Sequence, residues 1–348
     1  DLLCLCKLFI IKLLFKMKLL TIFTPSFNRK HTICRTFESL LRQTCKDFNW
    51  LIIDDGSSDG TKEWVESLGQ GTWVMSYAYD WMGRKTSSNS DNVHFVVDVP
   101  TPDGHSLHID YIRKPNGGLY TGYNVAYDFI QTELCVCIDS DDFAPDDAVE
   151  KISRLWKENG SDKYCGIEGL DFDINTMQPI GGYFPKNLKE VYLHDLSLKK
   201  IHSGDTKQVM RTELMRAVAP QVGFEGEKNF NPIYMLLQVC DKYPLLVIND
   251  NLCTVEYQIG ADSMSQGIYK QYMNSPRSFA KMRLQEMTLD HNTLKDKFRS
   301  AIHYVSSCMI ACDNHWFRKS TRKDLTLLAL PLGWLLSHYI RYKVRKML

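Results

Sequence analysis

Short apolar runs alternate with amphipathic segments along the first 160 residues of the chain. Strand-like runs, rich in β-branched and aromatic residues, occur at residues 19–24, 50–53, 108–112 and 134–138. Segments with apolar residues at helical spacing occur between and after them, at residues 31–43, 61–68, 119–131 and 145–156. Strands that alternate with helices over short links predict an α/β fold, with a mostly parallel, doubly wound sheet flanked by helices.

Two stretches depart from this alternation. Residues 70–107 are polar and rich in Ser, Asn, Asp and Gly, and we interpret them as an insertion that forms a hairpin or a mobile loop. Beyond about residue 265, apolar periodicity at 279–289, 294–308 and 325–340 is helical. We therefore expect one α/β domain over residues 17–265, followed by a helical C-terminal region over residues 266–348.

Composition narrows the class of protein only slightly. The chain has 348 residues, enough for one large or two modest domains. Its net charge of +1 carries no nucleic-acid signature, so we expect no nucleic-acid partner. The eleven cysteines are scattered, without a CxxC pair or zinc-ligand spacing. This usage favours reduced thiols in the cytoplasm.

The first residues are apolar but carry four lysines, at positions 7, 12, 16 and 18, which argue against a transmembrane span. No small-residue cleavage site follows them. The chain opens with Asp, whereas Met17 begins a natural-looking start. We interpret residues 1–16 as upstream sequence or a cloning remnant, with a basic amphipathic membrane anchor as the alternative.

A cluster of carboxylates follows the last strand-like run. Asp139, Asp141 and Asp142 lie within four residues, directly after the buried run 134–138. Mutual repulsion raises the pKa of at least one such group, and a divalent cation removes that repulsion. Oxygen ligands of this kind suit Mg²⁺ or Mn²⁺, often beside a phosphorylated substrate. The alternative is a turn with an Asp helix cap.

A second acidic pair follows an earlier strand. Asp54 and Asp55 come directly after the run 50–53. Ligands of open α/β sheets bind at the carboxyl ends of the strands, where both acidic groups fall. One group could accept hydrogen bonds from a ribose or base while the other holds a metal on a diphosphate. The chain has neither a GxxxxGK[ST] P-loop nor a GxGxxG after a strand, which disfavours NTP hydrolysis and dinucleotide binding.

Four motifs give this arrangement a family resemblance. They are IFTPSFN at residues 22–28, LIIDDGSSDGT at 51–61, KPNGGLYTGYNVA at 114–126 and CIDSDDFAPDDAVE at 137–150. In this order and spacing the chain resembles a family 2 glycosyltransferase of the GT-A fold. The resemblance is strong over residues 17–160 and weaker to about residue 260. It implies a Rossmann-like GT-A sheet in the domain of residues 17–265.

The resemblance also implies roles for individual residues. Residues implied in nucleotide-sugar binding are Pro25, Asn28, Asp54, Asp55, Asn116, Gly117, Gly118 and Asp139. Asp141 is implied as the direct metal ligand, with Asp139 beside it, and Asp142 as a cap of the next helix. Ordinary turns or a helix cap would explain the Pro25, Asn28 and Asn-Gly positions as well.

The acceptor side is expected in the second half of the chain. There the family places an acidic residue before an apolar helix, as a base for the acceptor hydroxyl. The family's usual Glu-Asp pair is replaced here by Asn231-Pro232. Glu227 is our first candidate for the base, Asp205 the second and Glu225 the third. Their alternative role is that of solvated surface carboxylates.

These features together predict a metal-dependent glycosyltransferase that uses a nucleotide sugar, in particular a UDP-sugar. The family resemblance implies a single displacement with inversion. The expected acceptor is a saccharide or a lipid-linked saccharide, and the expected setting is the synthesis of a surface polysaccharide. Two alternatives stay open. One is a nucleotide-sugar-binding protein without catalysis, and the other is a sugar nucleotidyltransferase, which would release pyrophosphate.

The C-terminal stretch suggests contact with a membrane. The apolar run 325–336 is interrupted by Pro331 and Gly333 and is too short to span a bilayer. Aromatic residues follow, and the chain closes with basic ones at positions 341, 343, 345 and 346. This pattern is typical of an interfacial helix on an anionic membrane, here the inner face of the cytoplasmic membrane. The alternative is a core helix with a solvated basic tail.

Overall fold

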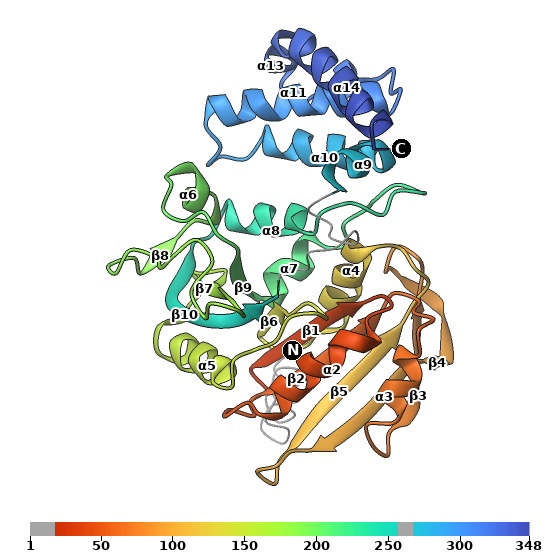
Figure 1. The fold of residues 1–348 in the computed structure, drawn as a ribbon, viewed down its shortest axis with the longest axis vertical. Helices are drawn as coiled ribbons and strands as arrows, with labels where there is room; N and C mark the ends of the chain where they lie inside the picture. Colours follow the sequence, from red (N-terminus) through yellow and green to blue (C-terminus); the bar gives the residue numbers. More distant parts are fainter. Residues whose placement is uncertain (1–17, 257–266, 348) are drawn as a thin grey trace, which may run out of the picture.

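A computed structural model describes residues 18–256 and 267–347 of the protein. Residues 1–16, interpreted above as upstream sequence, lie outside the described part. The described chain forms one ten-stranded sheet flanked by helices, with a helical region after it (Figure 1). The strands are β1 Leu20–Ser26, β2 Phe48–Asp54, β3 Thr72–Tyr79, β4 Lys85–Pro100, β5 Ser106–Arg113, β6 Leu134–Cys137, β7 Gly166–Asp173, β8 Glu190–Val191, β9 Thr206–Arg211 and β10 Leu245–Val255.

The sheet order is β3-β4-β5-β2-β1-β6-β9-β7-β10-β8. Strands β5, β2, β1 and β6 are parallel neighbours in its middle. Strand β9 runs antiparallel to both of its neighbours, β6 and β7, and β3 and β4 form an antiparallel extension at one edge. The expected α/β class is confirmed. The sheet is more mixed than we expected, because β9 and the β3–β4 hairpin run against the central strands.

Helices cover both faces of the sheet. Those described within residues 18–256 are α2 Lys30–Leu41, α3 Thr61–Glu66, α4 Leu119–Phe129, α5 Ala148–Asn159, α6 Leu193–Leu198, α7 Thr212–Val218 and α8 Ile233–Cys240. Apolar residues of α2, α3 and α5 pack against one face. Those of α4, α7 and α8 pack against the other. Both faces of the central strands are therefore buried.

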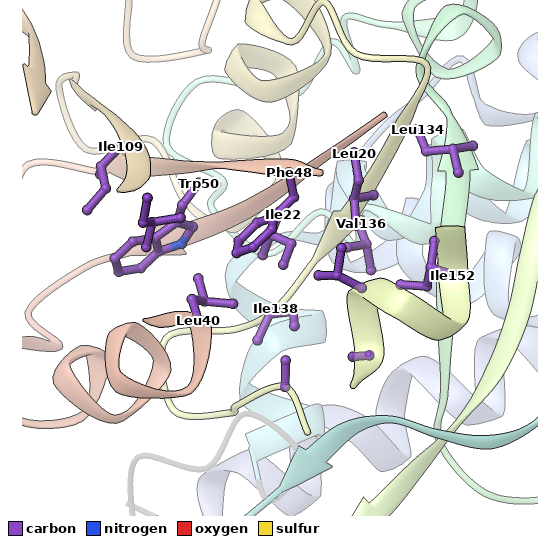
Figure 2. Packing of buried hydrophobic residues seen from close by; sticks show 14 of the residues in the cluster. Leu20, Ile22, Leu40, Phe48, Trp50, Ile109, Leu134, Val136, Ile138 and Ile152 are labelled. Carbon is purple, nitrogen blue, oxygen red and sulfur yellow. The ribbon is translucent and has the colours of Figure 1, made fainter. Parts of the chain in front are cut away.

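The central strands show how the sequence produces this two-sided burial. Leu20 and Ile22 of β1 point into the core beneath α2 and α5 (Figure 2). Phe23 of the same strand belongs to the core on the other face, beneath α4. Every residue of β1 is buried. Strands covered on both faces are expected to be continuous apolar runs, which is the pattern that identified them in the sequence.

A second helical layer follows at one end of the molecule's long axis (Figure 1). Its helices are α9 Ile268–Asn274, α10 Pro276–Glu286, α11 Leu294–Ile310, α12 Trp316–Lys319, α13 Lys323–Leu328 and α14 Leu330–Arg345. A separate apolar cluster holds these helices together. Gly333 lets α14 approach α11 closely, since a Cβ there would lie 2.6 Å from the Val305 side chain. Within the described ranges, no helix has both the length and the apolarity needed to cross a membrane.

The hairpin expected as one form of residues 70–107 is confirmed, because β3 and β4 pair antiparallel and extend the sheet. One local difference from the sequence analysis has a clear physical reason. Helix α5 begins at Ala148 rather than at Pro145, because the backbone of Phe143 exchanges two hydrogen bonds with Thr254 and stays extended. The expected cap by Asp142 is therefore wrong, since Asp142 lies six residues before α5.

Candidate active site

The loops that follow β1, β2 and β6 meet at one edge of the sheet, because these strands are parallel neighbours. This edge, which we call the carboxyl edge, receives Asn28 after β1, Asp55 after β2 and Asp139 after β6. Pro25 lies within β1 itself, paired in register with Ile53. The three acidic or polar groups found in the sequence thus reach the same edge, where α/β sheets bind ligands.

Asp54 is completely buried and has partners on both carboxylate oxygens. Its Oδ1 accepts the backbone N–H of Ser57 at 2.7 Å, and its Oδ2 accepts the hydroxyl of Tyr111 at 2.5 Å. Burial and the adjacent Asp54 charge raise the pKa of Tyr111 well above its usual range. The carboxylate therefore shapes the turn after β2 and ties it to β5.

Asp55 binds the loop that follows β5. Its Oδ1 accepts the Lys114 ammonium at 2.5 Å and the Gly117 N–H at 2.9 Å. Its Oδ2 accepts the Gly118 N–H at 2.8 Å and the Asn116 amide at 3.1 Å. Burial lowers the pKa of Lys114, although the Asp55 charge opposes this shift. Four donors on one buried carboxylate fix the backbone of residues 114–118.

Asn28 joins the turns after β1 and β2. It has a positive φ of 53°, a conformation that Asn tolerates better than most residues. Its backbone N–H donates to the Ser57 hydroxyl at 2.9 Å, and its side-chain oxygen accepts the Ser58 N–H at 2.9 Å. Asn28 thus orders two loops of the carboxyl edge at once.

The cluster after β6 contains more charge than the sequence suggested. Asp139, Asp141 and Asp142 share this place with Asp171 of β7 and with Lys207 of β9, whose ammonium lies 3.8 Å from the Asp171 carboxylate. Burial raises the pKa of Asp142 to about 8, against the Lys207 charge and helped by the neighbouring carboxylates. Burial likewise raises the pKa of Asp171 to about 6. Burial and the Asp139 charge raise the pKa of Asp141.

The antiparallel strand β9 explains how these residues meet. Val136 of β6 pairs with Val209 of β9, and Leu170 of β7 pairs with Thr206 of β9. The start of β9 therefore lies between the ends of β6 and β7, and it brings Lys207 under the cluster. Sequence reasoning missed Asp171 and Lys207 as members of the site. The available signal was a charged residue inside an apolar strand, which is rarely buried without a partner.

The cluster suits a hard divalent cation that is held jointly with a phosphorylated ligand. Mg²⁺ in such sites is bound by one or two carboxylates, with water and phosphate oxygens as its other ligands. Asp139 and Asp141 supply that number of carboxylates. One oxygen of buried Asp171 has no hydrogen-bond partner among the described residues. Within that same part of the chain, no three or more His, Cys, Asp or Glu side chains are already arranged around a metal position.

Glu227, our first candidate for the base, binds the start of α10. Its Oε1 accepts the backbone N–H of Arg277 at 3.1 Å and the Nε–H of the same residue at 2.9 Å. Its Oε2 accepts the N–H of Ser278 at 2.7 Å. The side chain is buried, so Glu227 serves as a cap that satisfies orphan donors of a helix N-terminus. Glu225, the third candidate, is exposed and offers its backbone carbonyl to Arg277.

Asp205, the second candidate, lies directly before β9. The register of β7 with β9 places it beside Asp171, and its charge contributes to the raised pKa of that residue. Its side chain is exposed. Of the three candidates, Asp205 is the one that the topology brings to the edge of Asp139 and Asp141.

The loop that contains Glu227 also covers the Asp55-bound loop. Lys228 donates a hydrogen bond to the side-chain oxygen of Asn116. Gly118 has a φ of 97°, and a Cβ there would lie 2.4 Å from the Lys228 carbonyl oxygen. On the other side, a Cβ at Gly117 would lie 1.8 Å from the carbonyl oxygen of Trp81, in the β3–β4 turn. The two glycines permit this close approach from both sides.

Comparison with known proteins identifies the domain that carries this edge. The model of the family described as glycosyl transferase family 2 matches residues 21–79 and 93–176. The chain contains a family 2 glycosyltransferase domain. The matched ranges include both acidic groups recognised in the sequence and also Asp171. They omit residues 80–92, which hold the β3–β4 turn and the first half of β4, inside the stretch interpreted above as an insertion.

Curated relatives resemble this glycosyltransferase domain over part of their length. A chondroitin synthase and a hyaluronan synthase of Pasteurella multocida are each 27% identical over 135 residues, or 39% of this chain. The chain spans only 10% of the length of each synthase. The poly(ribitol-phosphate) beta-N-acetylglucosaminyltransferase TarP of Staphylococcus aureus (strain N315) is 25% identical over 157 residues, 44% of this chain and 38% of TarP.

A solved structure supports the fold over nearly the whole chain. The crystal structure of S. aureus TarS 1-349 in complex with UDP-GlcNAc has a TM-score of 0.55 and 15% sequence identity. The match covers 93% of this chain and 87% of the TarS chain. At this identity the likeness establishes the shared GT-A-like fold, including the helical region after the sheet.

Proposed function

We propose that this protein is a glycosyltransferase of the EC 2.4 class that transfers a sugar from a UDP-sugar to a hydroxyl of a saccharide or lipid-linked acceptor. One observation carries the proposal: Asp139, Asp141 and Asp171 gather over Lys207 at the carboxyl edge of a family 2 domain. Burial raises the pKa values of Asp141 and Asp171, and clustered carboxylates of this kind at the ligand-binding edge of an α/β sheet favour a site for a metal and a diphosphate. The domain proposed for this reaction covers residues 17–265.

The sugar donor and the biosynthetic process that we propose are based on the proteins that this chain resembles in sequence or fold. TarS, which shares the fold, was crystallised with UDP-GlcNAc. The relatives similar in sequence are named as synthases of chondroitin and hyaluronan and as a β-N-acetylglucosaminyltransferase of poly(ribitol-phosphate). We therefore propose a UDP-sugar as the donor and the synthesis of a surface polysaccharide as the process. The proposed location is the cytoplasm, at the inner face of the cytoplasmic membrane.

The ordered loops of the carboxyl edge would hold the nucleotide. Asp54 and Asp55 have their oxygens occupied by protein donors, so we propose that they act mainly by ordering loops. The loop backbone at Asn116, Gly117 and Gly118 would lie against the nucleotide, opposite the turn that contains Asn28. Loops ordered before binding lower the entropic cost of holding a ligand.

Asp141, with Asp139, would hold the Mg²⁺ or Mn²⁺ ion. When bound, such an ion stabilises negative charge on the departing diphosphate. Lys207 is fixed beneath these carboxylates, where it limits their mutual repulsion. Asp142 and Asp171 are the buried members of this group.

Asp205 is the base that we now favour for the acceptor. Its carboxylate would take the proton from the acceptor hydroxyl while the hydroxyl oxygen bonds to the anomeric carbon. The bond from that carbon to the diphosphate oxygen breaks, and UDP leaves with the electron pair. One displacement of this kind inverts the anomeric configuration, as the family resemblance implies. Glu227 stays the alternative, although its oxygens accept three hydrogen bonds from the start of α10.

A screen of nucleotide sugars tests the proposal. Purified protein is incubated with UDP-, GDP- and TDP-sugars and a panel of saccharide acceptors, with Mg²⁺, Mn²⁺ or EDTA. We expect release of free UDP with one UDP-sugar, dependent on the added metal. Release of pyrophosphate from UTP and a sugar phosphate would instead identify a nucleotidyltransferase. Metal-dependent binding of UDP-sugar without turnover on any acceptor would favour a binding protein without catalysis.

A further inference from the structure

The outermost helices expose an apolar stripe. In α14, Leu332, Leu335, Tyr339 and Tyr342 recur at intervals of three and four residues, which places them on one face of the helix. Leu328, at the end of α13, extends the series by four residues. The five side chains are between 46 and 68% exposed. We call these five residues the outer stripe.

The outer stripe is unusual because α14 is already packed through its other face. Gly333, Ser337 and Ile340 are buried, and Gly333 lies against Val305 of α11. A surface helix of a globular domain normally presents polar residues opposite its packed face. Here the opposite face is apolar and aromatic, which marks it as a contact surface for a partner. In Figure 1, α13 and α14 form the layer farthest from the sheet.

The charge of the C-terminal region indicates which kind of partner would bind the outer stripe. Residues 316–348 hold eight basic residues and one acidic residue, Asp324, whereas the whole chain has a net charge of +1. Asp324 is already paired with Arg322 at 2.7 Å. The ammonium groups of Lys343 and Lys346 lie over the rings of Tyr339 and Tyr342, at 5.5 and 4.9 Å from the ring centroids. The stripe is therefore bordered by positive charge along its C-terminal half.

This combination fits an anionic lipid surface better than a second copy of the chain. A second copy would bring the same basic residues together, and Asp324 has its own partner. Tyrosine and tryptophan at the level of lipid headgroups, with lysines reaching to the phosphates, are typical of helices that lie in a membrane interface. Trp334, half exposed beside the stripe, adds a further ring of this kind. The length of α14 and its exposed leucines suit a flat orientation on a bilayer.

We propose that α13 and α14 bind the surface of an anionic phospholipid bilayer, with the outer stripe inserted among the headgroups and the basic residues of 318–346 against the lipid phosphates. This binding does not depend on the proposed sugar transfer, and it adds a partner that the donor site does not require. The leucines supply apolar burial, and the lysines supply attraction that weakens with salt.

Vesicle co-sedimentation of the full chain tests the proposal. The probes are phosphatidylcholine vesicles with about 30% phosphatidylglycerol, and vesicles of phosphatidylcholine alone. We expect binding to the anionic vesicles and a loss of binding at high salt. Leu332→Ser with Leu335→Ser should weaken binding by about tenfold for each leucine. Lys343→Gln with Lys346→Gln should weaken it by about fivefold for each lysine.

Matched controls separate the stripe from general surface effects. Leu294→Ser changes a leucine that is 65% exposed at the start of α11, and Lys186→Gln removes an exposed lysine far from α14 in the sequence. Neither should change vesicle binding. Thermal melting of each variant checks that the fold persists, as expected for side chains that are exposed or half-buried. Absence of wild-type binding to anionic vesicles, or unchanged binding of the leucine variant, would overturn the proposal. The proposal would also be overturned if the wild-type protein formed a dimer, did not bind vesicles, and became a monomer when the two leucines were replaced. That result would identify the outer stripe as a dimer interface.

Discussion

The ammonium of Lys207 lies 3.8 Å from the carboxylate of Asp171, two residues on strands that pair antiparallel beneath the carboxyl edge. Against the effect of burial, the charges of Asp171, Asp139 and Asp142 hold the pKa of Lys207 well above its usual range. The Lys207 charge in turn opposes the raised pKa values of Asp142 and Asp171. Because those carboxylates are buried or half-buried, the interaction is screened by water less than a surface ion pair would be. Strand β9 therefore contributes a charged side chain to the candidate site, in addition to its place in the sheet.

Replacement of this cation should destabilise the protein. Lys207→Met leaves buried carboxylates without a counter-charge, which we expect to cost about 3–5 kcal/mol at neutral pH. Urea denaturation followed by circular dichroism measures the loss. The loss should shrink near pH 5, because Asp171, whose pKa burial raises to about 6, is protonated there and no longer needs a counter-charge. Lys157→Met removes an exposed ion pair with Asp47 and should cost less than about 1 kcal/mol. Equal losses in the two variants would contradict the prediction.

Asp141 should be required for the effect of metal on donor binding. The Asp141→Ala protein should keep its fold and lose the metal-dependent thermal stabilisation by UDP-sugar, which is about 2.7 kcal/mol at a ligand concentration of a hundred times Kd. Differential scanning fluorimetry with Mn²⁺ or EDTA measures this difference. Asp146→Ala is the control, because Asp146 is an exposed carboxylate that pairs with Arg42. If UDP-sugar and metal stabilise the Asp141→Ala protein as much as the wild type, Asp141 is not a ligand of the metal.

The two candidates for the base should separate by what their loss affects. Asp205→Asn should lower kcat by roughly 10²- to 10⁴-fold, with donor binding nearly unchanged. Glu227→Gln should lower Tm by several degrees, because it weakens charge-assisted hydrogen bonds at the start of α10. Both quantities are measured on the same purified variants. Full turnover by the Asp205→Asn enzyme would show that Asp205 is not the base, and that Glu227 or another residue takes this role.

Glu168 should make stability depend on pH. It is completely buried on β7, with one oxygen accepting the Gln208 amide at 3.0 Å, and burial raises its pKa to about 8. Below about pH 4.5 the carboxyl is protonated in both folded and unfolded chains. Between that pH and 8 the folded chain keeps a proton that the unfolded chain has released. The contribution of Glu168 to the free energy of unfolding therefore falls as the pH rises through this range. The total fall is on the order of a few kcal/mol.

Glu168→Gln tests this directly, because the amide keeps the shape and does not titrate. Urea midpoints measured from pH 5 to pH 8.5 should fall more steeply in the wild type than in the variant. Parallel curves for the two proteins would show that Glu168 does not titrate in this range.

Gly117 should not tolerate a side chain. Its Cβ would lie 1.8 Å from the Trp81 carbonyl oxygen, so Gly117→Ala must displace the β3–β4 turn or the Asp55-bound loop. We expect a loss of about 1–3 kcal/mol and weaker UDP-sugar binding. Gly267→Ala is the control, since no described atom lies within 4 Å of the position of its Cβ. Calorimetric titration with UDP compares the two variants, and equal affinity would contradict the expected coupling.

The parts of the fold that depend on local pattern were predictable from the sequence. The strands β1, β2, β5 and β6 were found from continuous apolar runs, and α2 and α4 from helical spacing. The positions of Asp139 and Asp141 at a strand end followed from the same patterns. These features depend on residues that are close together along the chain.

Features that depend on distant pairing could not be predicted. Nothing local indicates that β9 inserts between β6 and β7, so Asp171 and Lys207 were not recognised as neighbours of Asp139. The partners of Glu227 lie 50 and 51 residues later in the chain, which made a helix cap resemble a free carboxylate. A single sequence records residue types and spacing, whereas these contacts are selected by packing of the whole domain.

The position of β9 in the sheet also bears on where the chain could be divided. A fragment that ends at residue 176, the end of the family match, would contain Asp139, Asp141 and Asp171 but lack both Lys207 and Asp205. It would also leave β6 and β7 without the strand that joins them, and two open edges would face solvent. The smallest autonomously folding piece should therefore extend through β10, to residue 255. Recombinant boundaries taken from the family match alone would yield an aggregation-prone half of a sheet.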